Sequence, residues 1–209
     1  LMNPAYTAAE VAVLMADSGA RVVICDAATS LVAQDAAAAV AGCEVIPTGS
    51  QQWQALLAAG SAPTDDAVHG SIGGDDLAVL LFTAGTSGRP KGAMLTHRSL
   101  LANIDGLREL TDPAPVLASD VVLAVLPMFH VYGLNTVLGL AVSAGARSVI
   151  VDRFDPVDSL RLIREHRVTT VAGAPAMYRA WLSIPGLREA LAGVRLFSSG
   201  GSSLPASVC

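Results

Sequence analysis

Lysine is nearly absent from this chain of 209 residues: twelve of its thirteen basic residues are arginine, and the remaining one is Lys91. Charged residues make up only 15% of the sequence, aromatic residues only 4%, and the formal net charge is -5. A nucleic-acid partner is therefore not expected, because such surfaces need clustered positive charge or aromatic rings on which bases stack. The hydrophobic fraction of 52% also excludes an intrinsically disordered chain.

Cysteine is scarce as well, and its spacing argues against a metal site or a disulfide framework. The three cysteines, Cys25, Cys43 and Cys209, are odd in number and form no Cys-x-x-Cys pair or Cys/His cluster. The first residues, "LMNPAYTAAEV", lack the basic region and apolar core of a signal peptide. These observations favour a reduced, cytoplasmic location.

The most apolar stretch, residues 121–144, raises the question of a membrane span. It contains Pro127, His130 and Asn135, and it lacks the unbroken run of about 18 apolar residues that a span needs. We therefore expect a buried strand followed by a buried helix, and no transmembrane segment. Any contact with a membrane would then be peripheral.

Helix and strand patterns alternate along the chain, which predicts an α/β fold of mostly parallel sheets flanked by helices. A capping box at Thr7 and Glu10 predicts the start of the first helix, and Gly19 its end. Further helices are expected at 31–41, 97–110, 132–143 and 156–167, and strands at 21–26, 43–48, 77–83, 121–127, 147–152, 168–173 and 194–201. Residues 60–76 are rich in Gly, Ser, Pro and Asp, so we interpret them as a linker between two α/β segments, 1–59 and 77–209.

A glycine-rich loop follows the strand expected at 77–83, in the sequence "LLFTAGTSGRPKG" of residues 80–92. Glycines allow backbone N–H groups to approach an anion, hydroxyl groups add donors, and Lys91 adds a compact cation suited to phosphate oxygens. The loop is not a Walker A motif, because Pro90 stands five positions after Gly85 and Gly92 follows the lysine. It also lacks the Gly-x-Gly-x-x-Gly fingerprint. Polyphosphate binding is the favoured interpretation, and an ordinary strand-to-helix turn is the alternative.

This loop resembles the signature loop of the adenylate-forming superfamily, which includes acyl-CoA synthetases, peptide-synthetase adenylation domains and firefly luciferase. It differs at Ala84, where serine is usual, and at Ser87, where threonine is usual. Residues 3–24 are similar to an early segment of acyl-CoA synthetases, and "LPMFHVYG" (126–133) resembles their second core motif. "SGGSSLP" (199–205) is similar to their adenine-site segment, although Ser202 and Ser203 replace the common Ala-Pro.

The resemblance implies an ATP-dependent acid–CoA ligase of the fatty-acid type, with the large N-terminal domain of an acyl-CoA synthetase as its fold. A carboxylic acid would react with Mg²⁺-ATP to give an acyl-adenylate, and coenzyme A would then displace AMP. Thr86 would lie nearest the phosphates and Mg²⁺, and Thr86, Lys91 and His130 would be the catalytic residues. The residues implied to hold ATP through the loop are Thr83, Ala84, Gly85, Thr86, Ser87, Gly88 and Lys91.

Two further segments receive binding roles from the same resemblance. His130 would border the acyl carboxylate and gate the acyl tunnel, with Phe129, Val131 and Gly133 shaping the pocket; the alternative for a histidine in an apolar run is a buried core position. Gly200, Gly201, Ser202 and Ser203 would lie against the adenine, and a simple strand-ending turn is the alternative. Weaker acyl-pocket candidates are Ala174, Pro175 and Met177.

Members of the superfamily are longer than this chain. The segments we do not find are the Tyr-Gly-x-Thr-Glu motif, the ribose-binding aspartate, the hinge and the C-terminal lid domain with its catalytic lysine. We therefore expect an incomplete AMP-binding domain that does not turn over alone. The alternatives to an acid–CoA ligase are an acyl-AMP ligase that feeds a carrier protein and a non-catalytic nucleotide-binding module. A P-loop kinase or ATPase is disfavoured by Gly92.

Overall fold

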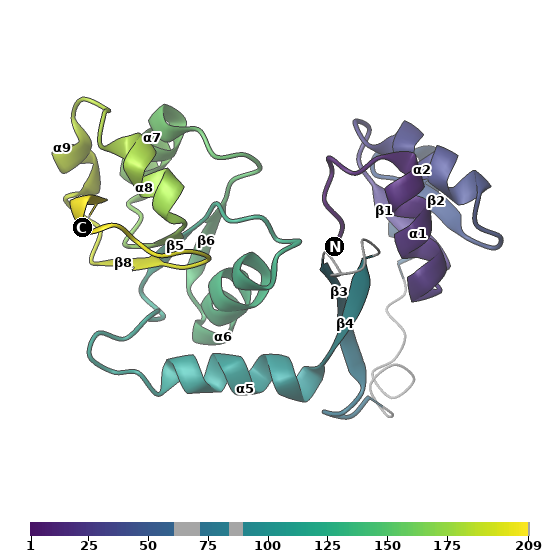
Figure 1. Cartoon of the computed structure of the whole chain (residues 1–209), viewed down its shortest axis with the longest axis horizontal. Helices are drawn as coiled ribbons and strands as arrows, with labels where there is room; N and C mark the ends of the chain where they lie inside the picture. Colours follow the sequence, from purple (N-terminus) through teal and green to yellow (C-terminus); the bar gives the residue numbers. More distant parts are fainter. Residues whose placement is uncertain (61–71, 84–89, 209) are drawn as a thin grey trace. The chain divides into compact units, whose positions relative to one another are not determined.

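The computed structural model describes residues 1–60, 72–83 and 90–208. These residues form two compact units, Leu1–His97 and Arg98–Cys209, each of which is described by itself (Figure 1). The segment interpreted as a linker, 60–76, falls within the first unit, and most of it lies outside the described residues. The division at 60–76 therefore stays a prediction.

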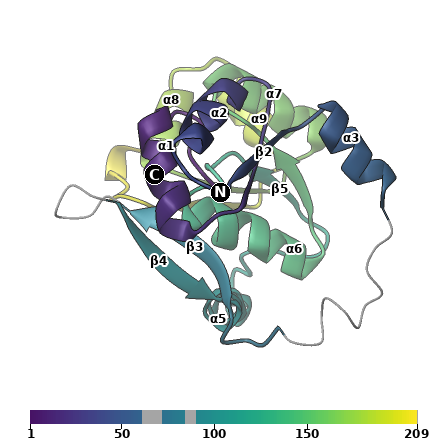
Figure 2. The ribbon, with the colours of Figure 1, turned by 90° about the vertical axis from the view of Figure 1, so that its right-hand side faces the viewer.

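The first unit opens with the predicted capped helix. In α1 (Ala8–Ser18), the Thr7 side chain accepts from the Glu10 amide, the Glu10 side chain accepts from the Thr7 amide, and Gly19 ends the helix with φ of 66°. The unit continues with β1 (Val22–Cys25), α2 (Ser30–Ala38), β2 (Glu44–Pro47) and α3 (Gln51–Ala58). Strands β1 and β2 pair in parallel, and α1 and α2 lie side by side against them (Figure 2).

The remaining strands of this unit form a hairpin that the sequence pattern did not predict. Strand β3 (Leu77–Thr83) matches the prediction, but it pairs antiparallel with β4 (Lys91–Thr96), which we had left without structure. The sequence "KGAMLT" has few strand-forming residues, so its strand conformation comes from pairing with β3. The glycine-rich loop therefore connects two strands of a hairpin, which rules out the alternative of a strand-to-helix turn, while polyphosphate binding by the loop stays a prediction.

The second unit is a four-stranded parallel sheet in the order β6-β5-β7-β8. Its strands are β5 (Val121–Ala124), β6 (Arg147–Ile150), β7 (Thr170–Gly173) and β8 (Leu196–Ser199). Its helices are α5 (His97–Arg108), which begins at the last residue of the first unit, η1 (Tyr132–Gly139), α6 (Leu140–Ala144), α7 (Pro156–His166), α8 (Pro175–Trp181), α9 (Leu187–Leu191) and η2 (Ala206–Val208).

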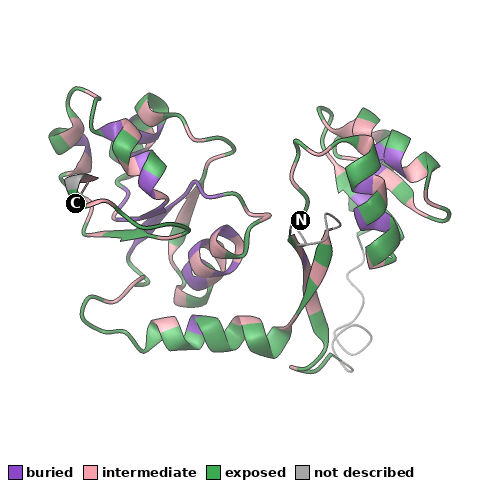
Figure 3. Cartoon of the chain, viewed as in Figure 1, coloured by how far each residue is buried: buried purple, intermediate pink, exposed green. Residues whose placement is uncertain are grey.

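The core of this unit is built from the two central strands and the helices that pack on them. Every residue of β5 and β7 is buried, and α7 and α8 contribute Leu160, Ile163 and Trp181 to the same core (Figure 3). Residues 132–143 form a helix as predicted, but its first part, η1, is a π-helix, which hydrophobic periodicity does not distinguish from an α-helix. The short helices α3, α8 and α9 were not predicted. Among the described helices, none is both long and apolar enough to cross a membrane.

Asp120 connects the beginnings of all four strands of this sheet. It directly precedes β5, and its backbone carbonyl accepts from Arg147 of β6 at 3.1 Å. Its side chain, 3% exposed, accepts from Thr169 before β7 at 2.7 Å and from the guanidinium of Arg195 before β8, with an Nε–Oδ1 distance of 2.9 Å. The Leu117 amide adds a fourth contact at 2.7 Å. Burial raises the pKa of Asp120, but these hydrogen bonds and the Arg195 charge outweigh it and lower the pKa to about 2.

We predict that Asp120→Asn lowers the free energy of unfolding by about 2–4 kcal/mol at pH 7, since Arg195 loses its charged partner. Because the folded pKa of Asp120 is depressed, this stabilisation is present above its ordinary value of 3.8 and is lost as the pH falls toward 2. Urea unfolding at pH 7 and pH 3 should therefore show a smaller difference between variant and wild type at the lower pH.

Asp158→Asn is the matched control, because it removes one carboxylate from an exposed pair with Arg161 on α7. It should change the free energy of unfolding by less than about 1 kcal/mol. If Asp120→Asn lowers the free energy of unfolding by the same amount at pH 7 and pH 3, the prediction is contradicted.

Candidate functional site

The two described ends of the glycine-rich loop lie opposite each other in the hairpin of the first unit. Thr83 is the last residue of β3 and Lys91 is the first residue of β4, and they are cross-strand partners. Both are exposed, which leaves the hydroxyl and the ammonium group accessible beside the loop. The other predicted loop residues, Ala84, Gly85, Thr86, Ser87 and Gly88, lie outside the described residues, and their roles stay predictions.

The predicted acyl-site segment in the second unit follows β5, at the carboxyl edge of the sheet. Open α/β sheets bind ligands at this edge. His130 is exposed, so it is not a buried core histidine, and its ring lies 4.9 Å from the ring of Phe129 between centroids. Val131 is 48% exposed. These residues are accessible to a ligand, while their assigned roles stay predictions.

At Gly133 the neighbouring backbone leaves no room for a side chain. A Cβ at this position would stand 2.3 Å from the Pro127 carbonyl oxygen and 2.8 Å from that of Leu126. The start of η1 therefore lies directly on the backbone that follows β5, and only glycine fits there. A contact between Gly133 and an acyl group stays a prediction.

The π-helix η1 is anchored to α5 by a buried amide. Asn135, 5% exposed, donates from Nδ2 to the Leu100 carbonyl at 3.1 Å and to Oδ1 of Asn103 at 3.0 Å. A buried amide is costly unless it is bonded, so these contacts fix the helix that carries the end of the 126–133 segment.

The predicted adenine-site segment follows β8, at the same edge of the sheet. A Cβ on Gly200 would stand 2.7 Å from Cε1 of Tyr132, so the glycine backbone lies directly against that ring. Gly201 has a φ of 83°, a left-handed conformation that favours glycine. Ser202 and Ser203 are exposed. The structure thus brings the segments 126–133 and 199–203 together, through Tyr132 and Gly200.

Two tyrosines in this region were not assigned a role from the sequence. Tyr132 lies within the 126–133 motif, so its position in that motif could have indicated it. Tyr178 of α8 lies beside Gly173, where a Cβ would stand 3.0 Å from the phenol oxygen, and no sequence signal marks it. Burial raises the pKa of Tyr178, and the neighbouring Tyr132 adds to this, so the Tyr178 phenol keeps its proton.

The weaker acyl-pocket candidates form the start of α8. Ala174 is its N-cap residue, and Pro175 and Met177 are buried. Met177 belongs to the hydrophobic core of the second unit, which accounts for its side chain without a ligand. A role of these residues in an acyl pocket stays a prediction.

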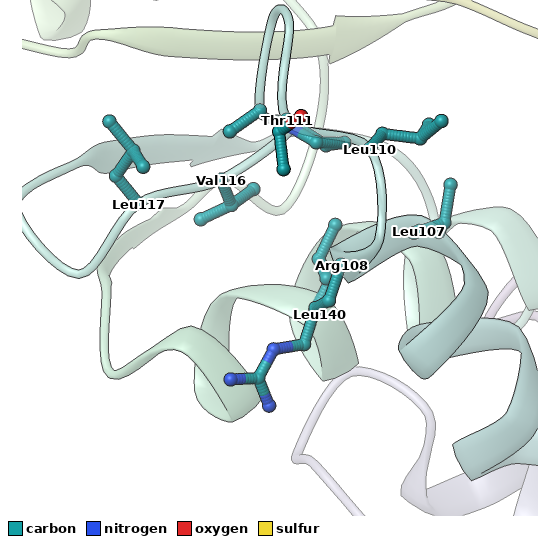
Figure 4. Close-up of a pocket in the computed structure, with 9 residues that line it drawn as sticks. Leu107, Arg108, Leu110, Thr111, Val116, Leu117 and Leu140 are labelled. Atoms are coloured by element: carbon teal, nitrogen blue, oxygen red, sulfur yellow. The ribbon is translucent and has the colours of Figure 1, made fainter.

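A cavity of about 350 Å³ lies elsewhere in the second unit, between the end of α5, the following loop and α6 (Figure 4). Its lining is mostly apolar, and Arg108 is the one charged residue in it. Arg108 donates to Ser143 at 3.1 Å. None of the predicted site residues lines this cavity. In the part of the chain that the structure describes, no group of three or more His, Cys, Asp or Glu side chains could hold a metal ion.

Comparison with known protein families gives one match over the whole chain. Residues 1–209 match the model of the family described as AMP-binding enzyme. Among characterised proteins, 4-coumarate–CoA ligase 5 of Oryza sativa subsp. japonica is 36% identical over 205 residues, which covers 96% of this chain and 37% of that enzyme. The long-chain-fatty-acid–CoA ligase of Bacillus subtilis (strain 168) is 37% identical over 140 residues, or 64% of this chain and 24% of that enzyme.

Several solved structures are similar along nearly the full chain. The crystal structure of ATP-bound MatB from Rhodopseudomonas palustris has a TM-score of 0.80 and 31% identity, covering 99% of this chain and 40% of that one. The inhibitor-bound N-terminal domain of FACL13 from Mycobacterium tuberculosis has a TM-score of 0.83 and 29% identity, covering 99% of this chain and 51% of that one. The chain thus spans about half or less of the proteins that it matches.

The contact between Gly200 and Tyr132 leads to a prediction about stability. Gly200→Ala should lower the free energy of unfolding by about 1–3 kcal/mol, because the added methyl group overlaps the Tyr132 ring. The cost should shrink in a Tyr132→Ala background, where the ring is gone. Urea unfolding of the two single variants and the double variant measures this coupling.

Gly193→Ala provides the control, because a Cβ at Gly193 meets no atom within 4 Å. Its free energy of unfolding should stay within about 0.5 kcal/mol of the wild-type value. Equal costs for Gly200→Ala with and without the Tyr132 ring would show that the two residues are not coupled.

Proposed function

Because the chain belongs to the AMP-binding enzyme family, we propose that the intact protein is an ATP-dependent acid–CoA ligase. The carboxylate of the acid attacks the α-phosphate of ATP, forming an acyl-adenylate and releasing pyrophosphate. The thiolate of coenzyme A then attacks the acyl carbonyl, forming a thioester and releasing AMP. Both steps develop negative charge that positioned donors and cations must stabilise.

The juxtaposition of Gly200 and Tyr132 is the observation that carries this proposal. It joins the segment expected near the acid and the segment expected near the adenine at the carboxyl edge of one parallel sheet. A ligase that transfers an adenylate to an acid needs those two subsites side by side. The ATP-bound relative supports ATP as the nucleotide.

The proposal gives each predicted binding segment a task of its own. Lys91, with Thr83 and the loop residues Ala84–Gly88, holds the outer phosphates and the leaving pyrophosphate. His130 lies beside the acid carboxylate, with Phe129, Val131 and Gly133 around the acyl group. Gly200–Ser203 provide a backbone surface and hydroxyl groups for the adenine. Mg²⁺ would neutralise phosphate charge next to Thr86.

For the acid, we favour a fatty acid, and an aromatic hydroxycinnamate is the second candidate. The Bacillus relative supports the first by its name, and the rice relative, which matches more of the chain, supports the second. A cytoplasmic location is part of the proposal, supported by the free thiols of Cys25 and Cys43.

Pyrophosphate exchange with the intact protein tests the reaction, using long-chain fatty acids and 4-coumarate in separate assays. Exchange that depends on one class of acid is expected, and thioester formation should require coenzyme A. If the adenylate forms but its acyl group is transferred only to a carrier protein, the acyl-AMP ligase alternative would be favoured. ATP binding by calorimetry without exchange would favour the non-catalytic module. The 209-residue chain alone is expected to give no exchange.

Lys91→Ala in the intact protein should reduce kcat/KM for ATP in this assay by about 10- to 1000-fold, as expected for loss of one charge-stabilising group. Arg188→Ala is the control, since it removes an exposed positive charge from α9 in the second unit. Arg188→Ala should leave kcat/KM unchanged. If Lys91→Ala used ATP like the wild type, the phosphate-binding interpretation of the loop would be wrong.

A further inference from the structure

Strand β8 leads directly into the segment expected at the adenine, yet it is weakly held by packing. It has four residues, and in the described sheet it is an edge strand that pairs only with β7. Of its residues, Phe197, Ser198 and Ser199 are exposed. The position of β8 therefore depends on the backbone ladder and on side chains from other elements that bond to it.

A side-chain hydrogen bond holds each end of this strand. At the amino end, Arg195 bonds to Asp120. At the carboxyl end, the Tyr178 hydroxyl donates to the Ser198 carbonyl. The same hydroxyl lies 3.4 Å from the Val171 carbonyl oxygen of β7. The second contact is the one next to the Gly200–Ser203 segment.

The Tyr178 side chain is itself fixed by its surroundings. Its ring meets Trp181 edge-on at 5.7 Å and Phe197 at 6.1 Å between centroids. Trp181 is 2% exposed and donates from Nε1 to Ser159 at 2.9 Å. The missing side chain of Gly173 leaves the space that the phenol occupies. A ring constrained on several sides holds its hydroxyl at one point.

The backbone after Ser198 is held by further contacts. Gly200 donates its amide to the Gly173 carbonyl at 3.1 Å, and its Cα lies against the Tyr132 ring. Tyr178, Gly173 and Tyr132 thus hold three successive points of the backbone between Ser198 and Gly200. We propose that Tyr178 is a positioning residue, whose hydroxyl fixes Ser198 and thereby the backbone of Gly200–Ser203 for the adenine of ATP. This inference rests on the proposed function.

The test is Tyr178→Phe in the intact protein, which deletes one hydroxyl and keeps the ring. Loss of one hydrogen bond should raise the KM for ATP about threefold to tenfold in pyrophosphate exchange. The KM for the acid and kcat should stay within about twofold of wild type, because Tyr178 acts on the nucleotide segment alone. In the ligand-free protein, amide hydrogen exchange at residues 199–203 should become faster.

Thr169→Val is the matched control, because it also deletes one hydroxyl from the same sheet. The Thr169 hydroxyl bonds to Asp120, at the amino edge. This variant should melt at a lower temperature, with the KM for ATP and the exchange at 199–203 unchanged. If both variants raise the KM for ATP equally, Tyr178 acts only through general stability and the inference is overturned.

Failure of the proposed function and failure of the positioning role of Tyr178 give different results. No ATP-dependent exchange and no ATP binding by the wild type would overturn the proposed function, and with it the role toward adenine. Unchanged amide exchange at 199–203 in Tyr178→Phe would overturn the positioning role of Tyr178, whatever the activity of the wild type.

Discussion

The second unit depends on the hydrogen bonds that the buried carboxylate of Asp120 accepts. Its backbone and side chain bond to the residues that begin or precede β6, β7 and β8, while Asp120 itself leads into β5. A carboxylate with 3% exposure is costly unless charged and polar partners surround it, and Arg195 and Thr169 supply them. The register of the four strands at their amino edge is therefore tied to one group.

With the amino edge fixed, the carboxyl edge is free to carry exposed and conformationally demanding residues. His130, Gly201 and the serines after it lie there, and they contribute little to the core. Close backbone contacts replace side-chain burial at this edge, as at Gly133 and Gly200. This division explains how one small sheet is both stable and able to present the segments 126–133 and 199–203 next to each other.

Features that depend on residues close in sequence were predicted correctly. The capping box at Thr7 and the apolar run of β5 are examples, because each is encoded within a few positions. Strand β4 was missed because its residues do not favour a strand until β3 pairs with them. Tyr178 and Ser198 are 20 residues apart, and Asp120 and Arg195 are 75 apart, so no local pattern could reveal those bonds.

The sequence by itself determined the alternation of helices and strands, the family resemblance and the segments expected to bind phosphate, acid and adenine. Those properties follow from local composition and from the order of motifs. Only the tertiary structure decided that the segments 126–133 and 199–203 meet and that the Tyr132 ring makes glycine necessary at position 200. It also decided that Tyr178 bonds to Ser198 of strand β8. Contacts between distant residues arise from the packing of β7, β8 and α8, and a linear sequence does not display that packing.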